Sequence, residues 1–382
     1  MQKKHLGRML CSFALSALTL WGVSVTTAAK DARAALRSLR EETFGVMLLR
    51  YERGDGGEEY LSMQTSLALR AAPLLRGEDE RIAQAWSTEL TQKPDDGAAG
   101  DAQDNEGTVL TQEKTPDEVA VTENGVPART LKASDPSGYT VFGNVYINNG
   151  SDAALDASML GADYAACLGA DEPQVLIIHT HGTESYTMPP GQEYDVSDTF
   201  RTLDTNCNMI RVGDEMARTL TECGISVVHD RALYDYPSYS GAYNRSLASI
   251  ERYLEKYPSI SFVLDVHRDA VQDANGNQFK LLCGEDAGAA QLEFVIGSNG
   301  GGLSHDLWRE NLKLACAVQE TLYKDHPTLM RPVTVRNSRY NQHMTTGSLL
   351  VEVGTAGNSL EEAINAARIF AAGFAKTLQN GE

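Results

Sequence analysis

The chain has 382 residues, of which 42% are hydrophobic, so it is long enough for two domains, or one domain with extensions, around a sizeable core. Its formal net charge of −19 argues against nucleic acid as a partner and against attachment to membranes through a basic surface. Its six cysteines form no C-x-x-C pair and have no regular spacing, which argues against a zinc ribbon and a disulfide framework; we expect most of them to be small buried side chains.

Residues 1–29 have the composition of a segment that enters a membrane. Basic residues precede the uncharged stretch Met9–Val25, whose length lies at the short edge of a membrane span. The small residues up to Ala29 suit a signal-peptidase site, so a retained signal anchor and a cleaved signal peptide both stay open. The positive-inside rule places the following chain outside the cytoplasm. We therefore predict a single-pass membrane protein with an extracytoplasmic domain, or a secreted protein if the signal is cleaved.

Two segments without recognisable chemistry follow. Residues 30–90 have apolar side chains at helical spacing, which predicts a helical membrane-proximal segment. Residues 91–135 are rich in acidic residues and contain no aromatic residue. Such a composition cannot bury enough apolar surface to offset the entropy of ordering. We predict a disordered acidic linker that separates the domain at 136–382 from the membrane.

Residues 136–382 alternate predicted strands with predicted helices. Strands are predicted at Tyr139–Phe142, Val145–Ile147, Val175–His179, Ile225–Val228, Ile260–His267, Leu292–Ile296 and Ser348–Val353. Helices are predicted at Asp152–Leu160, Asn208–Glu222, Tyr239–Lys256, Leu303–Leu322 and Leu360–Leu378. This alternation is typical of βαβ units. It predicts an α/β fold in which helices flank a mostly parallel, twisted sheet.

Polar residues stand at the ends of three predicted strands. His181 and Glu184 follow the first of these strands, His267 ends another, and Glu352 lies in the last. In a parallel sheet such ends meet at one edge. His181, Glu184 and His267 would supply two imidazoles and one carboxylate and leave a fourth position open, which is the pattern of catalytic zinc sites. Glu352 is then the candidate that takes a proton from water and passes it to a leaving amine.

Other polar residues near these strands have different predicted roles. Asp265 lies two residues before His267 on the same strand face and is expected to orient a neighbouring group. His179 lies deeper in its strand than the candidate ligands and is predicted to be structural. We expect His305 and His326 on exposed surfaces or at helix ends. Trp308, on a predicted helix, is expected in the core.

Four stretches, in this order, resemble the stage II sporulation protein P family: His179–Tyr186, Asp265–Ala270, Arg339–Gln342 and Leu350–Gly354. The resemblance covers roughly residues 139–378 and the N-terminal anchor. It implies a membrane-anchored cell-wall hydrolase of endospore-forming bacteria, with zinc-dependent N-acetylmuramoyl-L-alanine amidase activity and an added stem-peptide endopeptidase activity. The implied role is septal peptidoglycan thinning and engulfment during sporulation. The implied partners, besides peptidoglycan, are the lytic transglycosylase stage II sporulation protein D and the membrane scaffold stage II sporulation protein M.

The family is also similar to the wider zinc amidases, which implies a zinc amidase or zinc carboxypeptidase type of fold. His181-Gly182, His267 and Val351–Gly354 match the histidine and glutamate motifs of those enzymes, although Asp265 stands where they have serine.

The carboxylate ligand departs from that pattern. The wider amidases place it well downstream of the first histidine, near the start of the next helix, where this chain has Asp204. The spacing His181-x-x-Glu184 instead resembles zinc carboxypeptidases. Glu184 and Asp204 therefore both stay open as the carboxylate ligand, and Glu184 is favoured.

Arg201, Arg268, Arg339 and Asn341 are candidate substrate contacts. The stem peptide carries carboxylates, and arginine binds carboxylates through two parallel hydrogen bonds. Contacts within the domain are the alternative for each of these residues. Two other functions also stay open: a zinc peptidase that acts on other peptides, and a non-catalytic wall-binding scaffold on a degenerate hydrolase fold.

Overall fold

The computed structural model describes residues 108–109, 117–121, 126–161, 163–188, 200–272 and 278–380. The chain divides into two units, and only the second, Asp95–Glu382, contains described residues. The signal segment predicted at 1–29 and the helical segment predicted at 30–90 lie outside them. Within the described ranges, no helix has the length and apolar character needed to cross a membrane.

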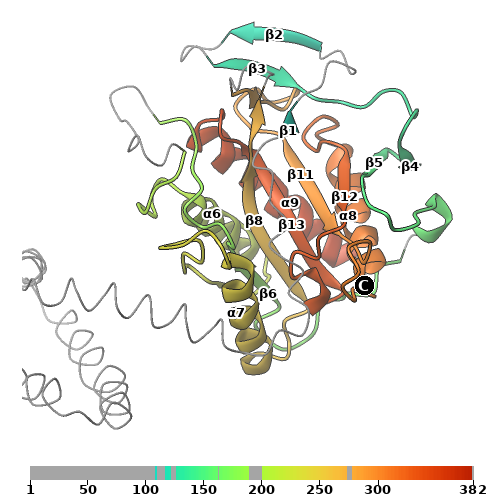
Figure 1. Cartoon of the computed structure of the whole chain (residues 1–382), viewed down its shortest axis with the longest axis vertical. Helices are drawn as coiled ribbons and strands as arrows, with labels where there is room; N and C mark the ends of the chain where they lie inside the picture. Colours follow the sequence, from blue (N-terminus) through green and yellow to red (C-terminus); the bar gives the residue numbers. More distant parts are fainter. Residues whose placement is uncertain are drawn as a thin grey trace, which may run out of the picture. The chain divides into compact units, whose positions relative to one another are not determined.

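A central sheet organises the described part of the chain (Figure 1). Its eight strands have the order β4-β5-β12-β11-β13-β8-β6-β7. They are β4 Thr140–Phe142, β5 Val145–Asn149, β6 Val175–Ile178, β7 Val227–His229, β8 Phe262–Asp269, β11 Leu292–Gly297, β12 Val333–Arg336 and β13 Gly347–Thr355. Five of the seven neighbouring pairs are parallel, and only β4–β5 and β11–β13 are antiparallel. The predicted α/β fold with a mostly parallel sheet is confirmed.

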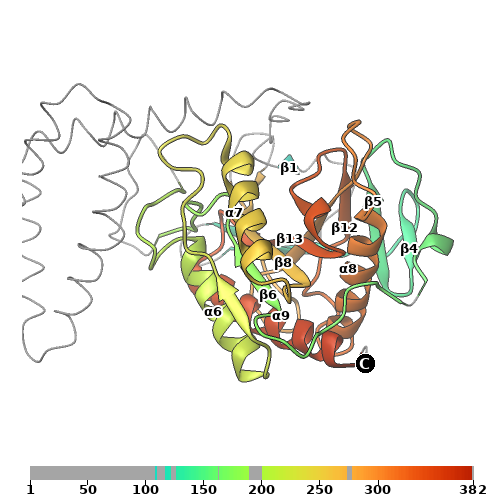
Figure 2. The same cartoon turned by 90° about the horizontal axis from the view of Figure 1, so that it is seen from below.

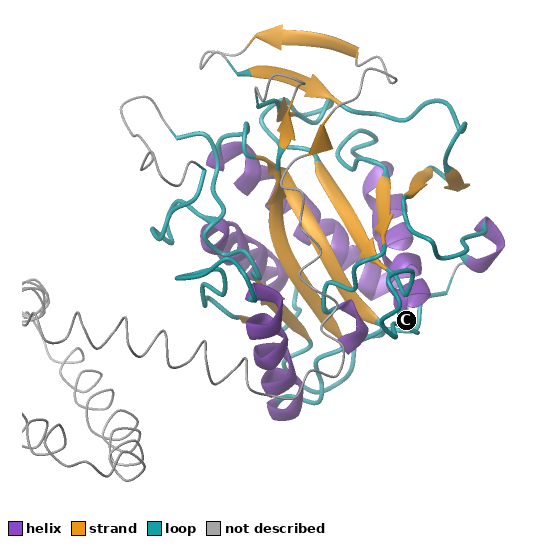
Figure 3. Cartoon of the chain, viewed as in Figure 1, coloured by secondary structure: helices purple, strands orange, loops and turns teal. Residues whose placement is uncertain are grey.

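Helices cover both faces of this sheet, as Figure 2 shows. The helices are α6 Met209–Glu222, α7 Ala242–Lys256, α8 Trp308–Tyr323 and α9 Leu360–Asn380. Alternation along β6 separates the two faces: Val175 and Ile177 join the core under α6, α8 and α9, whereas Leu176 and Ile178 pack with residues of α7. The distribution of helices around the strands is also clear in Figure 3. Each face of the sheet therefore has its own apolar contacts.

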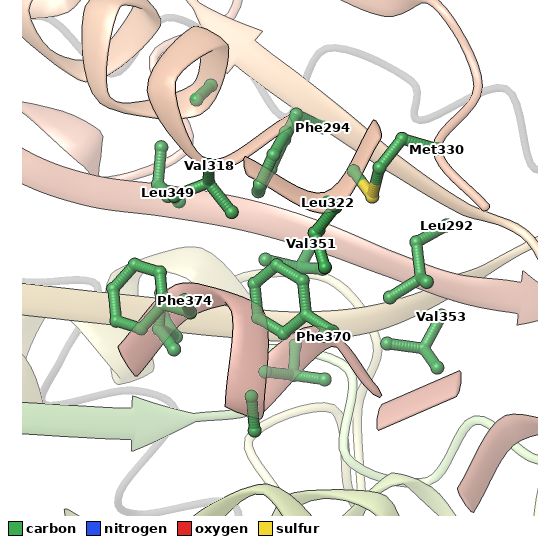
Figure 4. Close-up of a cluster of buried hydrophobic side chains, with 14 of the residues drawn as sticks. Leu292, Phe294, Val318, Leu322, Met330, Leu349, Val351, Val353, Phe370 and Phe374 are labelled. Carbon is green, nitrogen blue, oxygen red and sulfur yellow. The ribbon is translucent and has the colours of Figure 1, made fainter. Parts of the chain in front are cut away.

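Aromatic side chains attach α9 to the sheet (Figure 4). Phe370 and Phe374, about one turn apart, are fully buried. The ring centroid of Phe370 lies 5.8 Å from that of Phe294 on β11, and Phe374 lies 5.8 Å from Phe262 on β8. Burying a phenylalanine side chain stabilises the fold by about 1.5–3 kcal/mol. These contacts hold β8 and β11 against one helix, although β13 separates them in the sheet.

The compact domain begins earlier than the sequence predicts. Three further strands fall inside the predicted linker at 91–135: β1 (Thr108–Val109), β2 (Asp117–Val121) and β3 (Pro127–Thr130). The strand β1 pairs with β9 (Val271–Gln272), and β2 and β3 form a small sheet with β10 (Lys280–Leu281). The reason for the error is that β3 depends on partners some 150 residues away, including a 2.7 Å hydrogen bond from the Leu131 amide to the Gln291 side chain, and local composition does not reveal such partners.

Two other elements differ from the predictions. The helix predicted at Asp152–Leu160 is only the short 3-10 turn η2, Ala157–Met159, where Asp156 accepts a hydrogen bond from the Ser158 amide. This side-chain bond favours a turn over a longer helix. The strand β12 was not predicted, because its short sequence directly follows Pro332 and ends in the basic residue Arg336. The helices α6, α7, α8 and α9 are confirmed, although α7 and α8 begin a few residues later than predicted.

Glu215 on α6 forms an ion pair with Arg368 on α9. Its Oε1 atom lies 2.5 Å from Arg218 Nη2 and 2.9 Å from Arg368 Nε on α9. The Arg218 and Arg368 guanidinium groups hold the pKa of Glu215 at about 2, although burial opposes them. The folded state therefore favours the charged form of this carboxyl group more than the unfolded state does.

We predict that Glu215→Gln lowers the free energy of unfolding by about 1–2 kcal/mol at pH 7. Because the folded pKa lies below the ordinary value of 4.5, the contribution is complete above pH 4.5 and is lost as the pH falls towards about 2. Urea denaturation of the full chain at several pH values measures this difference. Glu222→Gln, at an exposed position of the same helix, is the control and should have little effect. A wild-type–variant difference that stays constant on acidification would contradict the prediction.

Candidate metal centre

The turn that follows β6 carries His181 and Glu184. The Glu184 amide donates a hydrogen bond of 3.1 Å to the His181 carbonyl and closes the turn. The Asp265 carboxylate on β8 accepts hydrogen bonds from the amide and the hydroxyl of Thr180, at 2.8 and 2.6 Å, and fixes the start of the turn. His181 and Glu184 are each only 5% exposed. Their predicted position just past the strand is confirmed.

His267 and Glu352 lie within their strands, whereas the sequence analysis places the polar residues at strand ends. Both β8 and β13 continue past them, and the two residues are register partners in this parallel pair. Their neighbours Val266 and Val351 belong to the core under α6, α8 and α9. Because side chains alternate along a strand, His267 and Glu352 face the other side of the sheet. The site therefore lies on a sheet face and not at its edge.

His181, Glu184 and His267 form one buried cluster. Their potential ligand atoms all lie within 4.8 Å of one another. The His181 Nδ1 atom is 3.7 Å from Glu184 Oε1, and His267 Nδ1 is 3.6 Å from Glu184 Oε2. These separations exceed a hydrogen bond, and they are close to the roughly 3.3–3.5 Å between donors around a tetrahedral ion with bonds of about 2.0–2.1 Å. The donor set and its spacing fit a zinc ion.

The structure separates the two candidate carboxylates. Glu184 is in the cluster, whereas Asp204 is exposed and accepts hydrogen bonds from the amide and side chain of Asn206 at 2.9 Å. Asp204 caps its own loop before α6. Glu184 is thus the carboxylate that stands beside the histidines.

The electrostatics of the cluster favour a cation. Burial lowers the pKa of His181 to about 3, so its imidazole is neutral and keeps a lone pair. Burial raises the pKa of Glu184, but the charge of Arg268 and contacts with the histidines outweigh it and keep that pKa below its usual value. Burial also lowers the pKa of His267, but Asp265 and Glu184 reverse the effect and raise it well above its usual value. The carboxylates therefore draw positive charge to the cluster.

Asp265 stands where the orienting role predicted from the sequence would place it. Its Oδ1 atom lies 3.0 Å from Nε2 of His267. This contact leaves Nδ1 of His267 on the side of Glu184, where a ligand atom is needed. A carboxylate on the far nitrogen fixes the ring orientation of a metal-binding histidine and raises its basicity.

Glu352 stands beside the cluster among other charged groups that the sequence analysis missed. In the described part of the chain, Glu352 Oε2 is buried without a hydrogen-bond partner. Its register partner on β11 is Glu293, and Arg331 Nη2 lies 2.8 Å from Glu293 and 2.7 Å from Asp269. Burial, opposed by His267 and supported by Asp269, raises the pKa of Glu352 well above its usual range. Glu293 could have indicated these charged groups, because it is a charged residue in the otherwise apolar strand predicted at Leu292–Ile296.

The candidate substrate contacts Arg201 and Arg268 are engaged within the domain. Arg201 lies near the cluster, with its Nη2 atom 3.6 Å from Glu184 and its Nη1 atom 2.9 Å from Asp235. Arg268 is buried and donates to the backbone carbonyls of Ser185 and Phe200, both at 3.1 Å. These bonds hold the segment around the cluster. For Arg268 they favour the alternative of contacts within the domain.

Arg339 and Asn341 lie in the loop between β12 and β13. Asn341 is buried and donates to the Tyr243 carbonyl at 2.8 Å and to Ser246 Oγ at 3.1 Å, which ties the loop to α7. Arg339 is half-buried and donates to the Ser304 carbonyl at 3.3 Å. Asn341 therefore positions the loop, and a substrate contact by Arg339 stays a prediction.

Three tyrosine rings lie beside the cluster, and they were not predicted from the sequence. The Tyr239 ring stacks on His181 at a centroid distance of 4.4 Å and an interplanar angle of 26°. Tyr243 lies 5.5 Å from His181 and 6.4 Å from His267, and Tyr340 lies 5.7 Å from Tyr243. These tyrosines come from a loop, a helix and a second loop, so only the tertiary structure brings them together.

The remaining histidine predictions have mixed outcomes. His179 is structural, as predicted: Nδ1 lies 2.9 Å from the Val266 carbonyl and Nε2 lies 2.9 Å from His229 Nε2. His305 was expected on an exposed surface or at a helix end; it is buried, and it lies just before the start of α8, so only the second alternative holds. Trp308 is fully buried, as predicted.

The expectation that most cysteines are buried is wrong for the described part of the chain. Of the five described cysteines, only Cys283 and Cys316 are buried.

Comparison with known proteins assigns the chain to a family. A family model described as Stage II sporulation protein P (SpoIIP) matches residues 60–375. The chain belongs to the stage II sporulation protein P family. The Stage II sporulation protein P of Bacillus subtilis (strain 168) is 28% identical over 225 residues, which are 56% of this chain and 53% of that protein. The chain thus spans about half the length of this curated relative.

Solved structures of amidases are similar to part of this family member. N-acetylmuramoyl-L-alanine amidase AmiC2 of Nostoc punctiforme is 15% identical with a TM-score of 0.31, over 56% of this chain and 96% of that one. The CwlD amidase of Clostridioides difficile, solved in complex with the GerS lipoprotein, is 14% identical with a TM-score of 0.33, over 55% of this chain and 98% of that one. Scores of this size do not establish a shared fold.

We predict that Asp265→Asn weakens zinc binding by this stage II sporulation protein P family member about 10- to 100-fold, because His267 loses the carboxylate on its far nitrogen. Competition with a fluorescent chelator measures the affinity. The matched control is Asp230→Asn, a buried carboxylate that accepts from Tyr234 and Ser249 away from the cluster. Equal affinities for Asp265→Asn and the wild type would contradict the prediction.

Proposed function

We propose that this chain is a zinc-dependent peptidoglycan hydrolase. It cleaves the amide between the lactyl group of N-acetylmuramic acid and L-alanine, and is thus an N-acetylmuramoyl-L-alanine amidase on a zinc amidase-like fold. The observation that carries the proposal is the buried His181–Glu184–His267 cluster with Glu352 next to it in register. Membership of the stage II sporulation protein P family supports it.

His181, Glu184 and His267 would hold the zinc ion through two imidazole nitrogens and one carboxylate. Zinc, when bound, supplies Lewis-acid polarisation of the amide carbonyl and of the attacking water. Arg201 and the Arg268 amide contact Glu184 at 3.6 and 3.2 Å and keep its carboxylate in place. The chain therefore contributes a preorganised and buried donor set.

Glu352 would carry the proton. Its unpartnered Oε2 atom is available to accept a proton from the attacking water and to deliver it to the leaving amine nitrogen. Burial raises the pKa of Glu352 well above its usual range, which favours its protonated form and suits delivery of the proton to the amine. The carboxylates around Arg331 contribute to that electrostatic setting.

Glu352 and the cluster also suit a peptide bond of the stem peptide, so the proposal includes an added endopeptidase activity. A zinc peptidase that acts on other peptides is the alternative, and the two differ in their products. Amidase cleavage releases intact stem peptides, whereas a peptidase releases fragments. A non-catalytic scaffold would need no metal donors, and the complete cluster argues against it.

The biological setting is part of the proposal. We place the domain outside the cytoplasm, held to the membrane by the segment at 1–29 or secreted if that segment is cleaved. There it would thin the septal peptidoglycan and support engulfment during sporulation. Stage II sporulation protein D and stage II sporulation protein M are the proposed partners.

We predict that His267→Ala and Glu352→Gln each reduce release of stem peptides from purified cell walls by at least about 100-fold, because the first removes a metal donor and the second removes the proton carrier. Mass spectrometry of the digest measures the products. The matched controls are His326→Ala and Glu320→Gln, which lie outside the site and should retain activity. Treatment with 1,10-phenanthroline should abolish release, and added zinc should restore it. Full activity in the presence of the chelator would sink the proposal.

A further inference from the structure

The two loops that Arg201 connects near the metal centre expose large apolar side chains. In the described part of the chain, the large hydrophobic residues that are exposed are Leu203, Tyr236 and Tyr239, with 50%, 54% and 39% of their surface accessible. They lie in two loops, one before α6 and one before α7. Of the three, Tyr239 contacts a candidate ligand, His181, so it is the residue that suggests a binding role.

Arg201 ties these two loops together. Its Nη1 atom lies 2.9 Å from Asp235, directly before Tyr236, and its guanidinium carbon lies 4.9 Å from the centre of the Tyr239 ring. Asp235 also accepts a hydrogen bond of 2.5 Å from the Thr183 hydroxyl, in the turn that carries the candidate ligands. The two loops therefore form one rim with a fixed position relative to the cluster.

Tyr239 is the residue of this rim that stands next to the candidate ligands. Its ring stacks on His181 at 4.4 Å while more than a third of the residue stays accessible. A ligand that reaches the cluster on this side passes over the exposed part of the ring. The flat surface suits a ring-shaped group with apolar C–H faces.

The charges of the rim favour an uncharged ligand. The guanidinium of Arg201 already contacts two carboxylates, Asp235 at 2.9 Å and Glu184 at 3.6 Å. It therefore has little attraction left for the carboxylates of a stem peptide. An uncharged sugar ring with hydroxyl and N-acetyl groups matches a rim of aromatic and aliphatic side chains better than an acidic peptide does.

We propose that Tyr239, with Tyr236 and Leu203 on the two loops that Arg201 connects, forms a subsite for the N-acetylated sugar rings of the glycan strand. The inference rests on the proposed function, because it identifies the side of the metal centre on which the sugar of the scissile linkage lies. The stem peptide then extends over the opposite side of the cluster. Tyr239 is a specificity-determining residue in this arrangement.

The test uses the full chain and hexa-N-acetylchitohexaose, an uncharged oligomer of N-acetylglucosamine without any peptide. Isothermal titration calorimetry measures its dissociation constant. Tyr239→Leu should weaken binding about five- to tenfold, whereas Tyr239→Phe, which keeps the ring, should stay within about twofold of the wild type. Leu203→Ser, outside the His181 stack, should weaken binding by a smaller factor. Tyr257→Leu, at the far end of α7, is the control for an unspecific loss.

A second measurement distinguishes weaker binding of the glycan from a loss of metal or of protein stability. On glycan strands with stem peptides, Tyr239→Leu should raise KM while zinc content and the thermal midpoint stay those of the wild type. If Tyr239→Leu and Leu203→Ser both bind the oligomer as the wild type does, the inference is overturned. Oligomer binding that depends on Tyr239 in a protein without amidase activity would uphold the sugar subsite and refute the proposed function. Amidase activity without oligomer binding that depends on Tyr239 would uphold the proposed function and refute the sugar subsite.

Discussion

The parallel pairing of β8 with β13 is the constraint on which the rest of the site depends. It sets His267 beside Glu352 and, in the same register, Val266 beside Val351. A slip of one residue in either strand would send its polar side chain into the core under α6, α8 and α9 and expose a valine on the other face. Burial of the apolar face, through contacts such as Phe262 with Phe374, therefore fixes the chemical face as well.

That chemical face gathers acidic groups, which are costly to bury without compensation. Asp265 is compensated by His267 and by Thr180, and Glu293 is compensated by Arg331. Glu352 keeps an oxygen without a partner in the described part of the chain. Glu352 lies beside the three candidate ligands, so a divalent cation held there would offset part of this negative charge. Metal binding would then also stabilise this face.

The sequence was sufficient for the order of the main helices and strands, because strong apolar periodicity survives without tertiary information. It was also sufficient to predict that His181, Glu184 and His267 lie together, since they follow or lie in two neighbouring strands. The choice between Glu184 and Asp204 needed the structure, because both are near in sequence and only the turn after β6 selects one. The role of Arg331 could not be predicted from the sequence, because the carboxylates that it pairs with, Asp269 on β8 and Glu293 on β11, come close only in the folded chain.

The small sheet formed by β3 and β10 has a mechanical consequence. Tension applied at the start of β3 reaches β10 through their parallel pairing. From β3 it passes to Gln291, whose side chain exchanges hydrogen bonds of 2.7 and 3.0 Å with the Leu131 backbone. Gln291 immediately precedes β11, two residues before Glu293. Tension at the start of β3 would thus also reach β11, the strand that carries Glu293 beside Glu352.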